Sequence, residues 1–142
     1  MWYIFWSKRT IVHFWWNNLG ESNLMATWNL DSTHSGASFS VRHMMVSTVR
    51  GSFSSLRGTL EYDPANPAAA SVEVEIDAAS IDTGVADRDN HLRSADFFDV
   101  EKYPHITFKS KKVELTGDDE ARITGDLTIR DITREVVIEA EY

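Results

Sequence analysis

The sequence predicts a mainly β fold, an antiparallel barrel or sandwich that contains one short helix. From Thr27 onward, apolar and polar residues alternate with a period of two, the spacing that places the side chains of a strand on opposite faces of a sheet. Turn-forming residues separate the alternating runs, for example in segments 63–67 and 116–120. Only segment 85–95 departs from this rhythm. Many short strands joined by turns are typical of antiparallel barrels and sandwiches.

Each alternating run gives its strand one apolar face. In segment 72–76 the valines and the isoleucine point one way, while Glu73 and Glu75 point the other. Further runs occupy 39–45, 49–53, 58–62, 106–108, 113–115, 123–129 and 136–140. On periodicity alone, such apolar faces either make a dry core or enclose one ligand. The residues that we expect to face the interior are Phe39, Val41, His43, Met45, Phe53, Val74, Ile76, Phe108, Leu127 and Ile129.

Segment 85–95 is predicted to be the one helix. Asp87 and His91 are four residues apart, as are Asp89 and Arg93, and side chains at this spacing pair on one side of a helix. The two aspartates and His91 superficially resemble a metal-binding set, but Asp89 projects from a different side of the helix. We therefore expect solvated ion pairs here, and no metal.

The overall composition limits the classes of function. The chain has 142 residues, 42% of them hydrophobic and 25% charged, which suits one globular domain with a real core. Its net charge of -8 argues against nucleic acid or an anionic membrane surface as the main partner. The absence of cysteine excludes disulfides, thiolate catalysis and cysteine-bound metals.

The N-terminal segment 1–25 differs from the rest of the chain. It contains four of the five tryptophans, and its Lys8 and Arg9 follow the first apolar run, unlike the order in a signal peptide. No part of it approaches the run of about 20 apolar residues that a membrane-spanning helix needs. We interpret 1–25 as a non-core aromatic extension and 26–142 as the domain; the alternative is an interfacial anchor. The lack of a signal-peptide pattern favours a cytoplasmic location and leaves periplasmic or secreted locations open.

No arrangement of residues indicates catalysis. Asp31, Ser32 and His34 lie too close together in the sequence for the geometry of a catalytic triad. The sequence also lacks a nucleophile-elbow motif and a phosphate-binding glycine loop. We therefore predict a protein without enzymatic activity.

Several segments together resemble the YceI-like family. The segments are 27–35 (TWNLDSTHS), 39–43 (FSVRH), 49–53 (VRGSF), 77–83 (DAASIDT), 88–99 (RDNHLRSADFFD) followed by Tyr103-Pro104, and 125–134 (GDLTIRDITR). They occur in the family's order and cover about residues 26–142. The resemblance implies a lipocalin-like antiparallel β-barrel that binds polyisoprenoids or other long lipids.

The resemblance gives the apolar faces a function. It implies non-catalytic binding, sequestration or transport of a polyisoprenoid or similar amphiphile, such as an isoprenoid quinone, in the barrel interior. The lipid would be the only bound group, without a metal or covalent cofactor. His43 is either a hydrogen-bonded core residue or a contact for the polar end of the lipid. Arg88, His91 and Arg93 are candidates for holding a lipid head group at the barrel mouth, with pairing to nearby aspartates as the alternative.

The sequence departs from the family beyond Tyr142, where the family continues with further barrel strands. A barrel closes only when all its strands are present, and open sheet edges pair readily with other chains. Three explanations are open: an incomplete C-terminus, which is the simplest, closure by a partner chain, or coverage by segment 1–25. The alternative function is therefore an interaction module whose open edges pair with a second copy, as a homodimer, or with another protein.

Overall fold

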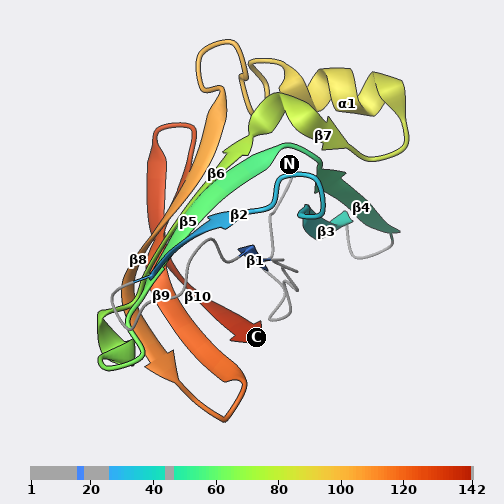
Figure 1. The fold of residues 1–142 in the computed structure, drawn as a ribbon. Helices are drawn as coiled ribbons and strands as arrows, with labels where there is room; N and C mark the ends of the chain where they lie inside the picture. Colours follow the sequence, from blue (N-terminus) through green and yellow to red (C-terminus); the bar gives the residue numbers. More distant parts are fainter. Residues whose placement is uncertain (1–15, 18–25, 44–46, 142) are drawn as a thin grey trace.

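The computed structural model describes residues 16–17, 26–43 and 47–141, which form β-strands and one α-helix (Figure 1). The short helices are η1 (Pro67–Ala69), η2 (Ala78–Ser80) and α1 (Ala86–Arg93). The strands are β1 (Trp16–Asn17), β2 (Ala26–Leu30), β3 (Ala37–His43), β4 (Ser47–Phe53), β5 (Leu56–Tyr62), β6 (Ser71–Asp77), β7 (Ile81–Asp82), β8 (His105–Leu115), β9 (Glu120–Ile129) and β10 (Ile132–Glu141). The predicted mainly β class is confirmed.

The strands form two antiparallel sheets. The larger has the order β1-β2-β5-β6-β8-β9-β10, and the smaller has the order β3-β4-β7. The chain passes from the small sheet to the large one between Phe53 and Leu56, at the β4–β5 junction. In Figure 1 the large sheet is strongly twisted, and α1 lies at one end beside β7. Within the described residues no strand pairing joins β10 to β3, so the sheets do not form a closed barrel there.

Strand β8 joins two runs that the sequence analysis separated. Its 11 residues pair with β9, and the register shifts between Ser110 and Lys112. This β-bulge adds one residue to β8, so the alternation changes phase within one continuous strand. Phe108 and Val113 are both buried although five positions separate them. The bulge thus keeps both halves of β8 facing the same core.

Helix α1 lies inside the segment predicted to be helical, but its side chains pair differently from the prediction. Asp89 accepts hydrogen bonds from the backbone N–H and hydroxyl of Thr83, at 2.9 and 2.5 Å. His91 Nε2 lies 3.0 Å from the Asp96 carboxylate, beyond the helix end. Among the described residues no ion pair joins Asp87 to His91 or Asp89 to Arg93, but the charge of Arg93 still helps to lower the pKa of Asp89. Spacing along a helix does not reveal such competing partners.

The core consists of two apolar clusters. The sheet cluster is Val72, Phe108, Val113, Ala121 and Ile123. The helix-end cluster is Phe53, Ala78, Ile81 and Ile106, and residues Leu92, Phe98 and Val100 from α1 and the segment after it pack against it. Leu127 packs against both clusters and connects them. The core therefore runs as one apolar layer from the large sheet to α1.

The predicted extension 1–25 lies mostly outside the described residues. Only Trp16 and Asn17 are described, and they pair with Leu30 and Asn29 of β2 as the short strand β1. The assignment of the remaining residues to a non-core extension stays a prediction.

A close approach of β8 and β9 at Gly125 yields a prediction about stability. A Cβ at this position would lie 2.6 Å from Phe108 Cζ and 2.8 Å from the Ser110 Cα, and it would also meet the Lys109 carbonyl oxygen. Displacing backbone atoms costs free energy. We therefore expect Gly125→Ala to lower the free energy of unfolding by about 1–3 kcal/mol. Urea denaturation measures this loss.

Gly117 provides the matched control in the turn of the same hairpin. The nearest atom to a Cβ there is 3.5 Å away, on the Glu120 side chain. Gly117→Ala is expected to change the free energy of unfolding by no more than about 0.5 kcal/mol, as is usual for surface substitutions. Equal effects of the two substitutions would contradict the packing argument at Gly125.

Candidate functional site: the apolar inner face

The inner face of the large sheet is built by strand register. Trp28 of β2 lies directly opposite Leu60 of β5, and Leu60 lies opposite Val72 of β6. Residues directly opposite each other in antiparallel strands share one face of the sheet. Farther along, Gly125 of β9 lies opposite Val136 of β10. We use the name inner face for the side of the sheets that carries these residues and the two core clusters.

Apolar contacts make this face continuous from the large sheet to the small one. Val136, Ile138 and Ala140 of β10 pack against the sheet cluster. At the other end, the Phe53 ring centroid lies 5.5 Å from that of Phe39 and 5.8 Å from that of Phe98. The Phe53–Phe98 pair has the edge-to-face arrangement that aromatic rings favour.

The opposite face of the large sheet carries charge. Lys109 contacts Glu73 at 3.1 Å across β8 and β6. Lys111, the bulge residue, contacts Asp126 at 3.0 Å and Glu135 at 3.1 Å. Hydrogen bonds to Asp126 and then to Glu135 raise the pKa of Lys111 above its ordinary value. The sheet thus separates an ionic outer face from an apolar inner face.

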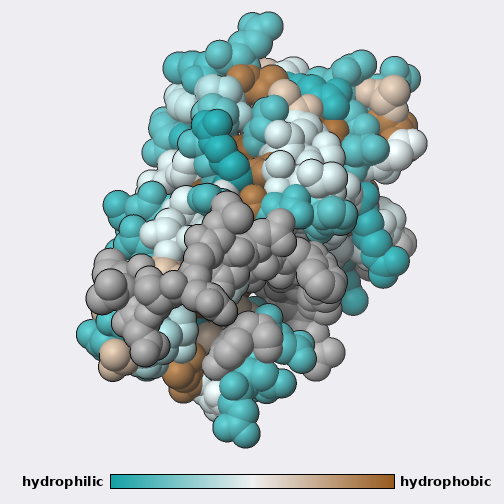
Figure 2. Space-filling model, in the orientation of Figure 1, coloured by the Kyte–Doolittle hydropathy of each residue, from teal (hydrophilic) through white to brown (hydrophobic). Residues whose placement is uncertain are grey.

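The view in Figure 2 shows where the apolar residues reach the surface. On this side of the molecule, hydrophobic residues appear as an interrupted strip in the upper half between hydrophilic flanks, with further patches at the upper right and the lower left. Hydrophilic residues cover most of the remaining described surface on this side, as the net charge of -8 implies.

The structure brings most of the predicted interior residues together. Phe53 and Phe108 are buried, and Val41 is half-buried on β3. The others that pack against the two clusters are Phe39, Val74, Ile76, Leu127 and Ile129. The backbone of His43 ends β3 opposite Ser47, while its side chain and all of Met45 lie outside the described residues. Contact of any of these residues with a ligand stays a prediction.

The predicted head-group residues Arg88 and Arg93 already bond within the chain. Arg88 donates from Nε to the Thr83 hydroxyl at 2.8 Å and from Nη2 to the Thr83 carbonyl at 2.9 Å. Arg93 donates to the carbonyl oxygens of Ala79 and Ile81, at 2.8 and 2.7 Å. These bonds fix α1 to the segment that precedes it.

His91, the third head-group candidate, lies at the exposed end of α1. Its ring contacts the Asp96 carboxylate at 3.0 Å and lies edge-on to Phe97 with 4.9 Å between ring centroids. A head-group role for His91, Arg88 or Arg93 stays a prediction, and such a role would compete with these internal contacts.

A polar cleft of about 600 Å³ lies beside α1. Its lining includes the buried carboxylate of Asp89 and the guanidinium of Arg93, both of which have partners within the chain. The hydrogen bond from the Thr83 hydroxyl is the largest of several influences that hold the pKa of Asp89 below its ordinary value. The residues that line the cleft are Ser54, Ser80, Ile81, Asp82, Gly84, Ala86, Asp89, Asn90 and Arg93.

Arg130 ties the β9–β10 hairpin to the segment after α1. It has a left-handed φ of 58° in the two-residue turn and donates from Nη1 to the Phe97 carbonyl at 2.9 Å. Its guanidinium also lies 5.5 Å from the centre of the Tyr103 ring. These contacts hold a strained backbone position in place and position the hairpin against the α1 end of the molecule.

Sequence reasoning did not single out several residues of this site. Ile81 is only 1% exposed, but it lies in a strand of two residues, too short for alternation to be visible. Phe98, by contrast, belongs to the aromatic pair in segment 88–99 that carries the family resemblance, and it packs against the helix-end cluster from the irregular segment after α1. Trp28 lies on the inner face of β2. The alternation of apolar and polar residues in Ala26–Leu30 could have predicted this position.

Residues 16–17, 26–43 and 47–141 contain neither a metal-binding cluster nor a membrane-spanning helix. In this part of the chain, no group of three or more histidine, aspartate or glutamate side chains is placed to hold a metal ion. None of the helices found there is long and apolar enough to span a membrane.

Comparison with known proteins identifies the family. A model described as the YceI-like domain matches residues 28–142. The chain belongs to the YceI-like family. A UPF0312 protein of Vibrio cholerae is 44% identical over 109 residues, which are 77% of this chain and 58% of that protein. Protein YceI of Escherichia coli is 43% identical over 122 residues, or 84% of this chain and 63% of that protein. The chain spans less than two thirds of the length of these relatives.

Solved structures agree with the predicted fold of this YceI-like chain. The crystal structure of Burkholderia cenocepacia BcnA superposes with a TM-score of 0.65 and 29% identity, covering 73% of this chain and 64% of BcnA. A polyisoprenoid binding domain from Saccharophagus degradans gives a TM-score of 0.59 at 18% identity, covering 82% of this chain and 66% of that domain. The resemblance and the fold class that the sequence predicted are confirmed.

The lowered pKa of Asp89 predicts a pH dependence of stability. Because the folded state favours the carboxylate, the stabilisation is present above the ordinary value of 3.8 and is lost as the pH falls through the lower folded value. We expect Asp89→Asn to reduce the free energy of unfolding most at neutral pH, and the difference from the wild type to shrink below about pH 4. Urea denaturation across the pH range measures this difference.

Asp87→Asn is the control for the loss of one acidic charge from α1, because Asp87 is exposed. A constant difference between Asp89→Asn and the wild type at every pH would show that the contacts of Asp89 with Thr83 do not depend on ionisation.

Proposed function

We propose that this YceI-like chain binds a polyisoprenoid or similar amphiphile along its inner face without catalysing a reaction. The observation that carries the proposal is the continuous apolar face that links the sheet cluster to the helix-end cluster through Leu127. The membership of the YceI-like family and the likeness in fold to a polyisoprenoid binding domain support it. Sequestration and transport of the lipid are both consistent with such binding.

Apolar burial would supply most of the affinity. Each methylene group removed from water contributes about 0.8 kcal/mol, so a few isoprene units suffice for tight binding. The inner face offers branched and aromatic side chains, such as Val136, Ile138 and Phe108, which suit a branched prenyl chain. Such binding involves no bond making or breaking, and no cofactor takes part in it.

A second candidate function uses the outer edge of β10. Alternate residues of an antiparallel edge strand turn their backbone N–H and C=O groups away from the neighbouring strand. Among the described residues nothing pairs with this edge of β10, and Ile132 and Val137 on the strand are 57% and 52% exposed. Open edges of this kind pair with other strands. A second copy of the chain could bind there and form a homodimer.

Two neighbouring residues of β10 test the binding function. Ile138 packs on the inner face, whereas Val137 is exposed on the opposite face. We expect Ile138→Asp to weaken the binding of geranylgeraniol at least about tenfold, because it places a carboxylate in the apolar site. Isothermal titration calorimetry with the full chain measures the dissociation constant.

Val137→Asp is the matched control, since it adds the same charge one residue away on the outer face. We expect its affinity for geranylgeraniol to stay within about twofold of the wild type. Thermal unfolding of both variants confirms that they are folded. Equal affinities of the two folded variants would place the lipid somewhere other than the inner face.

A further inference from the structure

The indole N–H of Trp28 is a buried hydrogen-bond donor without an acceptor in the part of the chain that the structure describes. Its Nε1 atom is shielded from solvent and has no hydrogen-bond partner among residues 16–17, 26–43 and 47–141. Nearly all buried polar groups in folded proteins are hydrogen-bonded, so each exception needs an explanation. The indole N–H can only donate, which means that the missing partner must be an acceptor.

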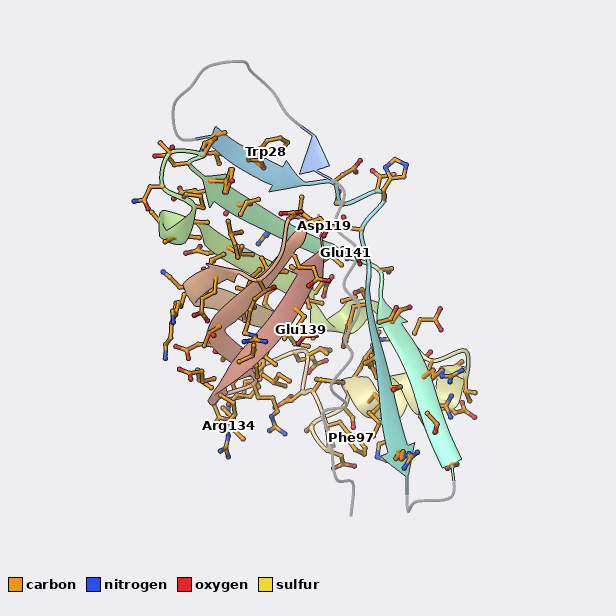
Figure 3. All side chains as sticks on the ribbon, turned by 90° about the horizontal axis from the view of Figure 1, so that it is seen from below. Trp28, Phe97, Asp119, Arg134, Glu139 and Glu141 are labelled. Carbon is orange, nitrogen blue, oxygen red and sulfur yellow. The ribbon has the colours of Figure 1, made fainter. Side chains whose placement is uncertain are left out.

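The position of Trp28 connects this donor with the proposed lipid site. Trp28 is directly opposite Leu60, which packs against the sheet cluster, and Leu60 is opposite Val72, a member of that cluster. Trp28 therefore shares the inner face with residues proposed to contact the lipid. Figure 3 shows Trp28 on β2 well separated from Phe97, which lies beyond α1.

The neighbours of Trp28 indicate the kind of acceptor. On the same face of the paired strands, the nearest residues are uncharged: Ala26 and Leu30 on β2, and Leu60 and Tyr62 on β5. A buried phosphate would need cationic partners to offset the loss of its hydration. The positions of β2 and β5 that lie on this face contain no Lys or Arg. An uncharged oxygen fits this environment.

We propose that Trp28 donates its indole N–H to an uncharged oxygen, such as a carbonyl or a hydroxyl, of the isoprenoid bound on the inner face. This inference rests on the proposed function and deepens it. It places the polar end of the ligand near β2 and its apolar chain along the sheet toward α1. The opposite orientation would bring the polar end to Arg88 and Arg93, whose guanidinium groups already bond to Thr83, Ala79 and Ile81.

The test compares three probes with the full-length wild type and Trp28→Phe. The probes are geranylgeranylacetone, which is a prenyl ketone, the hydrocarbon with the same carbon skeleton, and geranylgeranyl phosphate. One neutral hydrogen bond favours the ketone over the hydrocarbon by about fivefold in the wild type. Trp28→Phe is expected to abolish this preference and to leave the affinity for the hydrocarbon within about twofold. Isothermal titration calorimetry gives the dissociation constants.

Tyr62→Phe is the matched control, because it removes a hydroxyl from the neighbouring residue pair on the same face. We expect this variant to keep the preference for the ketone. The five tryptophans allow a direct second readout, since the indole N–H signal that is missing from the NMR spectrum of Trp28→Phe belongs to Trp28. That signal is expected to move downfield with the ketone and not with the hydrocarbon.

The possible outcomes separate this inference from the proposed function. Binding of neither uncharged probe to the wild type overturns the proposed function and the role of Trp28 with it. Binding without preference for the ketone, or a preference that persists in Trp28→Phe, overturns only the role of Trp28. Tighter binding of the phosphate than of the ketone overturns the assignment of an uncharged acceptor.

Discussion

The structure depends on one constraint, that every strand of the large sheet keeps its apolar side chains on the same side. Where strict alternation would turn apolar side chains to the other side of the sheet, a local change in the backbone keeps them on the same side. The bulge at Lys111 lets Phe108 and Val113 share one core, and it turns the lysine toward Asp126 on the outer face. At Gly125 the lack of a side chain lets β9 approach β8 closely. The continuous inner face, and therefore the proposed lipid site, follows from these two local adjustments.

Charged residues near α1 make contacts within the chain that stabilise the fold. These contacts affect which end of a bound lipid would lie near α1. Arg88 and Arg93 donate hydrogen bonds to nearby backbone and hydroxyl oxygens, and the Asp89 carboxylate accepts a hydrogen bond from the Thr83 hydroxyl. Arg130 anchors the β9–β10 hairpin to the same end of the molecule. The donors named here have partners within the chain, but the Arg130 Nε atom, like the Trp28 Nε1 atom, is buried without a hydrogen-bond partner among the described residues. The unpartnered donor of Trp28 lies on β2, on the inner face itself.

Most of the fold could be predicted from the sequence, because alternation reports directly which face of a strand is buried. The interior positions of Phe53 and Phe108 follow from this rule. The continuity of β8 could not be predicted, since a bulge leaves no distinctive residue pattern. The partners of Arg93 are backbone carbonyls, which no residue spacing reveals. The unsatisfied indole of Trp28 was likewise invisible, because satisfaction of a hydrogen bond depends on tertiary neighbours.

Native mass spectrometry of the full chain, purified without detergent, tests the central claim most directly. The account predicts a monomer that carries a non-covalent isoprenoid, identified by its mass after gentle dissociation. A lipid-free dimer would contradict the account and favour pairing through the open edge of β10. A lipid-free monomer that also fails to take up added isoprenoid would show that the apolar inner face is only a structural core.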